Sequence, residues 1–332
     1  MKKLFSSSIT GPLLALLLVF LCVALTTDRF LSPGNLSNLF LQVSIVSIVA
    51  IGATFVILIG GIDLSPGSAI ALLTVLFASS IKFVGVPLPV AILLVVAMGA
   101  LLGLLNGVLV AYLRIPAFIA TLAALSAFRG VAFGFNNGSP VFSIHPDLES
   151  IFYGTFLGAP LPLYYVIFLY GLSFMVLRYT AFGRSIYAVG GNPRAAELSG
   201  LNVKKIQMYC FVIAGIAAAI GAVLMAARLN SGSPNYGVGL ELAAIAAAVV
   251  GGASLTGGRG NIINTALGAM TIVIVQNGLN LNAVPTSAQN VIVGAIIVIA
   301  VAIDIWRDDI TSKIKGRFQS TKNVSKKKPP LI

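Results

Sequence analysis

The sequence predicts an all-α polytopic membrane protein. Hydrophobic residues make up 58% of its 332 residues and charged residues 9%, whereas soluble domains have roughly 45–50% and about 25%. Apolar runs close to the ~20 residues that a helix needs to cross the hydrocarbon recur from one end of the chain to the other. We therefore expect a single domain that crosses a membrane many times.

Ten apolar segments have the length and composition of transmembrane helices. The first follows a basic start, as in a secretory signal, but no clear cleavage site comes after it, so we expect a retained helix. The segments form a transmembrane domain over residues 1–306, and a basic tail, 307–332, follows. The predicted spans are 9–27, 38–59, 65–83, 87–112, 115–135, 161–178, 206–227, 240–256, 262–280 and 288–306.

The positions of the basic residues test this count. With the N-terminus inside, seventeen of the 21 Lys and Arg residues fall in inner segments, while Arg29, Lys82 and Arg228 fall in outer ones and Arg129 lies within a span. Basic loops stay on the cytoplasmic side, so we expect about ten helices with both termini cytoplasmic. The net charge of +12 then reflects topology and contact with lipid, and no binding of nucleic acid is expected.

A carboxylate, Asp63, lies directly after the second apolar run, in the stretch GGIDLSPGS over 60–68. The charge count places this stretch at the inner end of two helices. Ser65 is placed to cap the third helix and Pro66 suits its first turn. Gly61, Asp63 and Ser65 thus form a candidate inner-mouth motif. Two roles stay open for Asp63: offsetting the positive end of a helix, or acting in a gate or a partner contact.

Glycines recur at four-residue spacing in the fourth and fifth predicted spans. Gly99, Gly103 and Gly107 share one helix face, and Gly130 and Gly134 repeat the spacing. Small faces let membrane helices approach each other closely. We favour packing within the chain over a dedicated subunit interface.

The stretch GGIDLSPG over 60–67 has an echo in GGASLTGG over 251–258, and both follow the pattern G-G-x-x-L-[ST]-x-G. The second stretch is not a phosphate-binding loop, because Gly258 and Arg259 stand where that loop needs Lys and Ser or Thr. We therefore expect no ATP hydrolysis by the chain alone.

Residues for catalysis or metal binding are scarce. The single histidine is His145, and Cys22 and Cys210 both lie inside apolar runs, where small buried hydrophobes are expected rather than a disulfide. We predict no catalytic residue, no metal site and no cofactor bound by this chain. Few ionisable residues lie within the spans, whereas ion-driven carriers usually have more, so transport powered elsewhere or passive flow is expected.

The longest inner connection includes a segment, about 184–205, with a short predicted helix at its centre. Asn192 can cap it, Pro193 suits its first turn and Gly200 can end it. Such a helix is too short to span and has Leu198 as its one sizeable apolar residue, which favours docking to a soluble partner over lipid binding. Its residues are Asn192, Pro193, Arg194, Ala195, Ala196, Glu197, Leu198, Ser199 and Gly200.

Several long stretches, in this order, resemble the permease subunits of ABC importers of the ribose type. They are GGIDLSPGS, IPAFIATLAALSAFRGVAF, YAVGGNPRAAELSGLNVKKI, LELAAIAAAVVGGASLTGGRG and GLNLNAVPTSAQNVIVGAIIVIAVAID. The resemblance covers about 35–305. It departs at Arg194 and Glu197, whose charges are reversed relative to the usual pair, and at Ala243, where the family commonly has Asp.

The resemblance implies a homodimeric pore in the bacterial cytoplasmic membrane. Partner subunits would bind ATP and Mg²⁺ and dock on residues 192–200, and a solute-binding protein would deliver a small neutral sugar, such as a pentose, hexose or polyol. Alternatives are a related permease for branched-chain amino acids or a furanosyl signal molecule, a stand-alone channel or secondary carrier, and a scaffold that does not transport.

Uncharged polar side chains within the spans are candidates for lining the pore, although an interhelical hydrogen bond is the expected role of any one of them taken alone. These candidates are Asn106, Ser126, Asn264, Thr265, Gln276 and Asn277. The outer-loop bases Arg29, Lys82 and Arg228 are candidates for contact with acidic groups of the binding protein.

Overall fold

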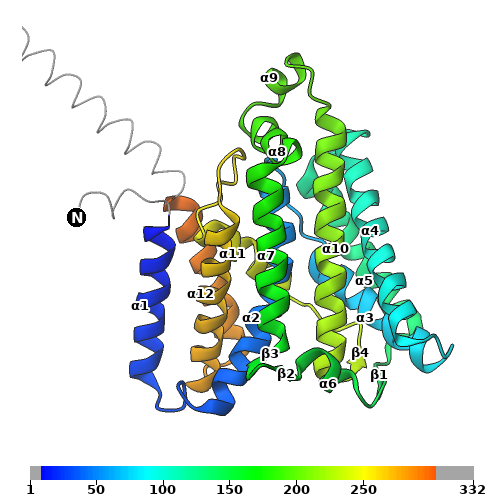
Figure 1. The fold of residues 1–332 in the computed structure, drawn as a ribbon, viewed down its shortest axis with the longest axis vertical. Helices are drawn as coiled ribbons and strands as arrows, with labels where there is room; N and C mark the ends of the chain where they lie inside the picture. Colours follow the sequence, from blue (N-terminus) through cyan, green and yellow to red (C-terminus); the bar gives the residue numbers. More distant parts are fainter. Residues whose placement is uncertain (1–8, 304–332) are drawn as a thin grey trace, which may run out of the picture.

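The computed structural model describes residues 9–303, which form a bundle of helices packed side by side (Figure 1). Seven helices in this range are long and apolar enough to cross a membrane. They are α2 (Pro33–Leu58), α4 (Leu88–Ala111), α5 (Ala117–Gly134) with the 3₁₀ turn η2 (Phe135–Gly138), α7 (Leu161–Tyr179), α10 (Val203–Leu229), α12 (Ile262–Leu281) and a last helix (Thr286–Ile303).

Three shorter apolar helices occupy the remaining predicted segments: α1 (Thr10–Thr26), α3 (Pro66–Lys82) and α11 (Leu240–Val250). This confirms the all-α polytopic class, and that all ten helices cross the membrane stays a prediction. The span predicted at 240–256 was too long. The chain leaves α11 at Val250 because Gly252 and Gly257 adopt φ angles of 88° and 86°, which only glycine takes without strain. The predicted tail lies outside the described residues.

The two ends of the bundle carry different small elements (Figure 1). At one end, α8 (Ala181–Gly191) lies beyond the end of α7, and α9 (Pro193–Leu198) lies at the tip, beyond the end of α10. At the other end lie the short helix α6 and two antiparallel strand pairs. Their bounds are α6 (Leu148–Tyr153), β1 (Val141–Phe142) with β4 (Ser231–Gly232), and β2 (Thr155–Phe156) with β3 (Ala159–Pro160).

Two non-helical stretches enter the bundle from opposite ends. Residues 60–65 lead from α2 into α3, and residues 230–239 lead from α10 into α11. The two helix starts meet, because a Cβ added to Gly237 would lie 2.3 Å from the carbonyl oxygen of Gly67. Non-helical backbone is tolerated at membrane depth only where protein or a polar cavity surrounds it.

The glycine stripe of α4 packs against α10 within the chain, as the sequence predicts. A Cβ on Gly103 would lie 2.3 Å from the carbonyl oxygen of Phe211, and one on Gly99 would lie 2.5 Å from that of Gly215. A Cβ on Gly107 would lie 2.9 Å from the carbonyl oxygen of Met208. By contrast, a Cβ at Gly130 or Gly134 of α5 would meet nothing within 4 Å, so these two glycines make no close contact within the described residues.

We expect Gly103→Ala to lower the thermal unfolding midpoint of the detergent-purified protein, because the added methyl group must separate two packed backbones. Overpacking of this kind costs about 1–3 kcal/mol. The matched control is Gly130→Ala on α5, where a helical alanine meets open space and should leave the midpoint unchanged or raise it slightly. Equal midpoints for the two variants would contradict the packing described for α4 and α10.

Candidate functional site

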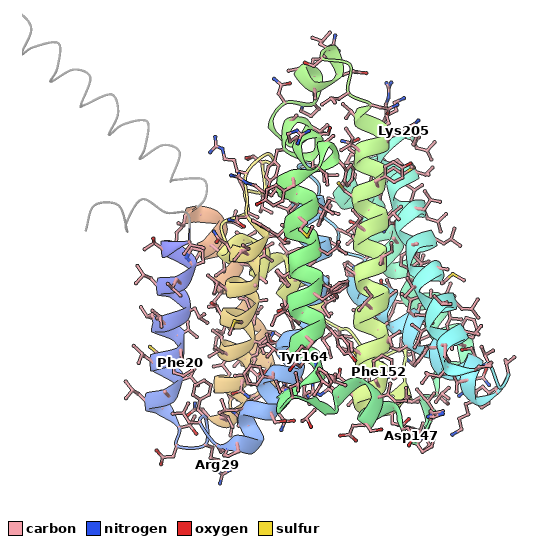
Figure 2. The ribbon with its side chains drawn as sticks, viewed as in Figure 1. Phe20, Arg29, Asp147, Phe152, Tyr164 and Lys205 are labelled. Atoms are coloured by element: carbon pink, nitrogen blue, oxygen red, sulfur yellow. The ribbon has the colours of Figure 1, made fainter. Side chains whose placement is uncertain are left out.

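The short helix α9 has the caps that the sequence predicts. The Asn192 side-chain oxygen accepts a hydrogen bond of 3.0 Å from the backbone N–H of Ala195, and Pro193 is the first helical residue. Gly200 follows the helix with φ of 83°, which suits glycine after a helix end. Figure 1 shows α9 at the tip of the bundle, and Figure 2 places Lys205 at the same end.

The surface of α9 is open to a partner. Every residue over 191–200 is exposed except Ala196, which packs into the core. Leu198 is 80% exposed, and Arg194 and Glu197 flank it with one charge of each sign. A single exposed leucine gives a lipid surface little to bury, whereas an apolar tip with charged neighbours suits a groove on a protein.

Asp63 is hydrogen-bonded to Ser65, the residue before α3. Its Oδ1 accepts two hydrogen bonds from Ser65, one from the backbone N–H at 2.9 Å and one from the hydroxyl at 2.7 Å. Helix α3 does begin at Pro66, but the expected cap by Ser65 is wrong, because its hydroxyl makes no capping bond and donates to Asp63 instead. The carboxylate thus holds the turn that leads into α3.

Asp63 lies inside the bundle, and its place at the inner mouth stays a prediction. Its side chain is buried, with 5% exposed. It lines a small cavity together with Ala214, Gly215 and Ala218, which lie near the middle of the 27-residue helix α10. The physical reason for this burial is that residues 60–65, which join α2 to α3 in non-helical form, lie inside the bundle.

Asn106 connects α4 to this carboxylate. Its side-chain N–H donates to the Ser65 hydroxyl oxygen at 2.8 Å, so the hydrogen-bond chain runs from Asn106 through Ser65 to Asp63. Asn106 is 2% exposed, and its amide oxygen has no hydrogen-bond partner among the described residues. The adjoining cavity has a volume of about 10 Å³, close to the minimum for one water molecule. We call the group of Asp63, Ser65 and Asn106 the polar centre.

A second polar group lies where α11 begins. Arg129 of α5 donates to the carbonyl oxygens of Pro234 and Tyr236, the second at 2.7 Å. Its charge attracts that of Glu241, whose Oε2 would be 1.9 Å from a Cβ on Gly67. Arg129 thereby holds the stretch before α11, and the Glu241 carboxylate covers the start of α3.

The six predicted pore-lining residues lie on three helices, α12, α4 and α5. Thr265 and Asn277 of α12 bond to α2: Thr265 lies 3.0 Å from the hydroxyl of Thr54, and Asn277 exchanges two hydrogen bonds with Asn35. These are the interhelical bonds expected of such side chains. Asn264 is buried and Gln276 half-buried, both on α12, Asn106 lies in the polar centre, and Ser126 is exposed at the middle of α5.

The three predicted outer bases all lie at the end opposite α9, which Arg29 marks in Figure 2. Arg29 is exposed and Arg228 half-buried in the last turn of α10. Lys82 is exposed too, but its ammonium group donates to the carbonyl oxygen of Phe142, so it holds β1 as well as facing solvent.

Sequence reasoning missed the partners of these groups. Asn35 and Tyr187 were not singled out, although Asn35 pairs with Asn277, and the Tyr187 hydroxyl donates to the Gly260 carbonyl oxygen at 3.1 Å. A signal for Asn35 existed, since an amide near the start of one apolar span can pair with an amide near the end of an antiparallel one. No group of three His, Cys, Asp or Glu residues that could hold a metal is found within residues 9–303.

Comparison with known families gives one match over most of the chain. Residues 35–301 match the family described as the permease component of the branched-chain amino acid transport system. No solved structure matches the chain significantly.

Curated relatives are similar over nearly their whole length. The ribose import permease protein of Haemophilus influenzae is 40% identical over 88% of this chain and 91% of its own. That of Bacillus subtilis is 40% identical over 89% of this chain and 92% of its own. The xylose transport system permease protein of Haemophilus influenzae is 35% identical over 88% and 94%.

We expect Asp63→Asn and Asp63→Ala to differ in stability. Asparagine keeps an Oδ1 that can accept both bonds from Ser65, whereas alanine leaves two buried donors unsatisfied, at about 1–3 kcal/mol each. The thermal unfolding midpoint should therefore fall clearly for Asp63→Ala and only slightly for Asp63→Asn. If both variants lose the same stability, then the negative charge of Asp63, and not its acceptor atom, holds the start of α3.

Proposed function

The chain belongs to the family of permease components of the branched-chain amino acid transport system type, and from this premise we propose that it is the membrane-spanning subunit of an ATP-driven importer of a small neutral sugar. The observation that carries the proposal is the identity of 40% over nine-tenths of each chain to ribose import permeases. The solute class is a pentose, hexose or polyol, with ribose the first to test. The chain itself translocates and does not hydrolyse ATP.

The exposed helix α9 supports docking of a separate ATP-binding subunit. This partner would hold ATP and Mg²⁺, and its movement would displace the segment around 184–205. A solute-binding protein would dock at the opposite end, where Arg29 and Arg228 lie. Rim charges of this kind mainly increase the rate of encounter.

We also propose that all ten apolar helices cross the bacterial cytoplasmic membrane. The end that carries α9 then faces the cytoplasm with both termini, as the positive-inside distribution of Lys and Arg requires. The shortness of α3 and α11 does not oppose this, because the stretches 60–65 and 230–239 complete each crossing in non-helical form.

A second copy of the chain is part of the proposal. Ser126 lies exposed at the middle of α5, one turn from half-buried Arg129, and Asn235 of the stretch before α11 is exposed as well. Polar side chains that face lipid at this depth are costly. A pore between two copies would give these groups water or solute hydroxyls as partners.

The movement that we propose for Asp63 is that of a gate. Its segment is non-helical, is held by a few hydrogen bonds and adjoins a cavity too small for a sugar, so this conformation is closed at that point. Displacement of residues 60–65 by the partner's ATP cycle would open the path. Non-helical segments of this kind absorb large backbone changes during switching.

Branched-chain amino acids are the second candidate solute, favoured by the description of the matching family. The interior argues for the sugar. A zwitterion needs partners for both of its charges, and the guanidinium of Arg129 on α5 already donates to the two carbonyl oxygens of Pro234 and Tyr236.

Uptake by proteoliposomes tests the function directly. The chain should be co-purified with the ATPase from its native membrane, reconstituted with its binding protein, and supplied with radiolabelled ribose, xylose or leucine. We expect ATP-dependent accumulation of a sugar and none of leucine. Leucine uptake would establish the second candidate, and uptake by the chain alone, without ATPase or binding protein, would identify a stand-alone carrier.

A charge at the tip of α9 tests the docking surface. We expect Leu198→Asp to lose co-purification of the ATPase, because a carboxylate replaces the one large apolar side chain of the exposed face. The control is Leu157→Asp, at a leucine that is 86% exposed in the hairpin between β2 and β3 at the opposite end. The control should retain the ATPase, and retention by both variants would exclude α9 as the docking element.

A further inference from the structure

The two glycine motifs that echo each other in the sequence touch each other in the structure. The backbone N–H of Gly258 donates to the carbonyl oxygen of Leu58 at 2.9 Å. A Cβ on Gly257 would lie 2.8 Å from the backbone nitrogen of Gly60. The motifs therefore provide two complementary backbone surfaces that no side chain separates.

The end of α8 completes this contact. A Cβ on Gly190 would lie 1.8 Å from the carbonyl oxygen of Leu58 and 2.5 Å from the nitrogen of Gly258, and one on Gly257 would lie 2.8 Å from the carbonyl oxygen of Gly190. Three backbones thus meet at one point, which we call the glycine junction and define as Leu58, Gly60, Gly190, Gly257 and Gly258. Contacts between backbones cannot yield by a change of rotamer, so a displacement of one segment must move the others.

The glycine junction is tied to α9 by side chains. Ala196, the one buried residue of α9, belongs to the same apolar cluster as Ile186 and Val189 of α8 and Val56 and Leu58 of α2. Close to the junction, the Tyr187 hydroxyl of α8 donates to the carbonyl oxygen of Gly260. A movement of α9 therefore reaches the junction through packed residues only.

The glycine junction is also close to the polar centre. Gly60 precedes Asp63 by three residues, and the hydroxyl of Thr121 in α5 donates to the carbonyl oxygen of Ile62 at 3.1 Å. On the other side, the stretch that contains Gly257 and Gly258 joins α11 to α12. The glycine junction thereby links α9 to the stretch that leads into α3 and to the stretch that follows α11.

We propose that the glycine junction transmits displacement of α8 and α9 to the Asp63 segment, with Gly190 as its positioning residue. The proposal rests on the proposed function, because it assumes that a partner moves α9. The proposal gives the two glycine motifs a role beyond tight packing. Because of their contact, residues 60–65 and residues 257–260 move together.

The test compares Gly190→Ala with Gly191→Ala in the full chain. The two glycines are neighbours at the end of α8, but a Cβ on Gly191 would meet nothing within 4 Å. In the ATPase complex, Gly190→Ala should keep the ATPase bound and lose roughly tenfold or more of transport and of solute-stimulated ATP hydrolysis, the size of a typical coupling between sites. Gly191→Ala should match the unmodified protein. Unimpaired transport by Gly190→Ala would overturn the proposal.

Hydrogen exchange in the purified chain alone separates this proposal from the proposed function. Gly190→Ala should speed exchange of the amides over 60–65 and 257–260, whereas Gly191→Ala should not. Tyr187→Phe, which removes only the hydroxyl bond to Gly260, guards against misfolding of Gly190→Ala and should speed exchange in the same two stretches. Unchanged exchange over 60–65 in both Gly190→Ala and Tyr187→Phe would overturn the glycine junction. If no ATPase partner is found, the proposed function is wrong. The hydrogen-exchange result then still tests whether the glycine junction couples the two stretches.

Discussion

The structure depends on one constraint, which is that backbone groups inside a bundle of membrane helices must find hydrogen-bond partners in the protein. Helices satisfy this by themselves, so the two non-helical stretches, 60–65 and 230–239, determine what surrounds them. Thr121 donates to the carbonyl oxygen of Ile62, and Asp63 accepts the free N–H of Ser65. Arg129 donates to two carbonyl oxygens before α11. Asp63, Thr121 and Arg129 are thus polar side chains that lie where the helices are broken.

Glycine makes these broken helices possible. The starts of α3 and α11 meet through Gly67 and Gly237 at a distance that no side chain would permit, and α4 approaches α10 through Gly103 in the same way. Close backbone contact brings Asn106 within reach of Ser65 and carries the Asp63 segment against the middle of α10. The packing of the glycines therefore also determines the polar contacts, because it sets the distance between groups such as Asn106 and Ser65.

The sequence predicted the helical segments and the caps of α9 well, because both follow from local patterns: apolar length for the spans, and Asn, Pro and Gly at fixed positions for the short helix. It failed where the answer depends on contacts distant in the sequence. The depth of Asp63 could not be derived, since charge distribution reports only on which side of the membrane a loop lies. Likewise, the echo of 60–67 in 251–258 was visible as a pattern, but its meaning required knowledge that the two stretches touch.

The charges inside the bundle support a neutral solute. Asp63 lies at the start of α3 and Glu241 in the first turn of α11, where the positive ends of helices offset negative charge. Arg129 attracts Glu241 and donates to Pro234 and Tyr236. What remains unpaired at the polar centre is a single amide oxygen, that of Asn106, which can accept a hydrogen bond from a hydroxyl group or from water. An interior with few charges and a free acceptor suits a solute that carries hydroxyl groups and no net charge, and it leaves the driving force to a partner outside the bundle.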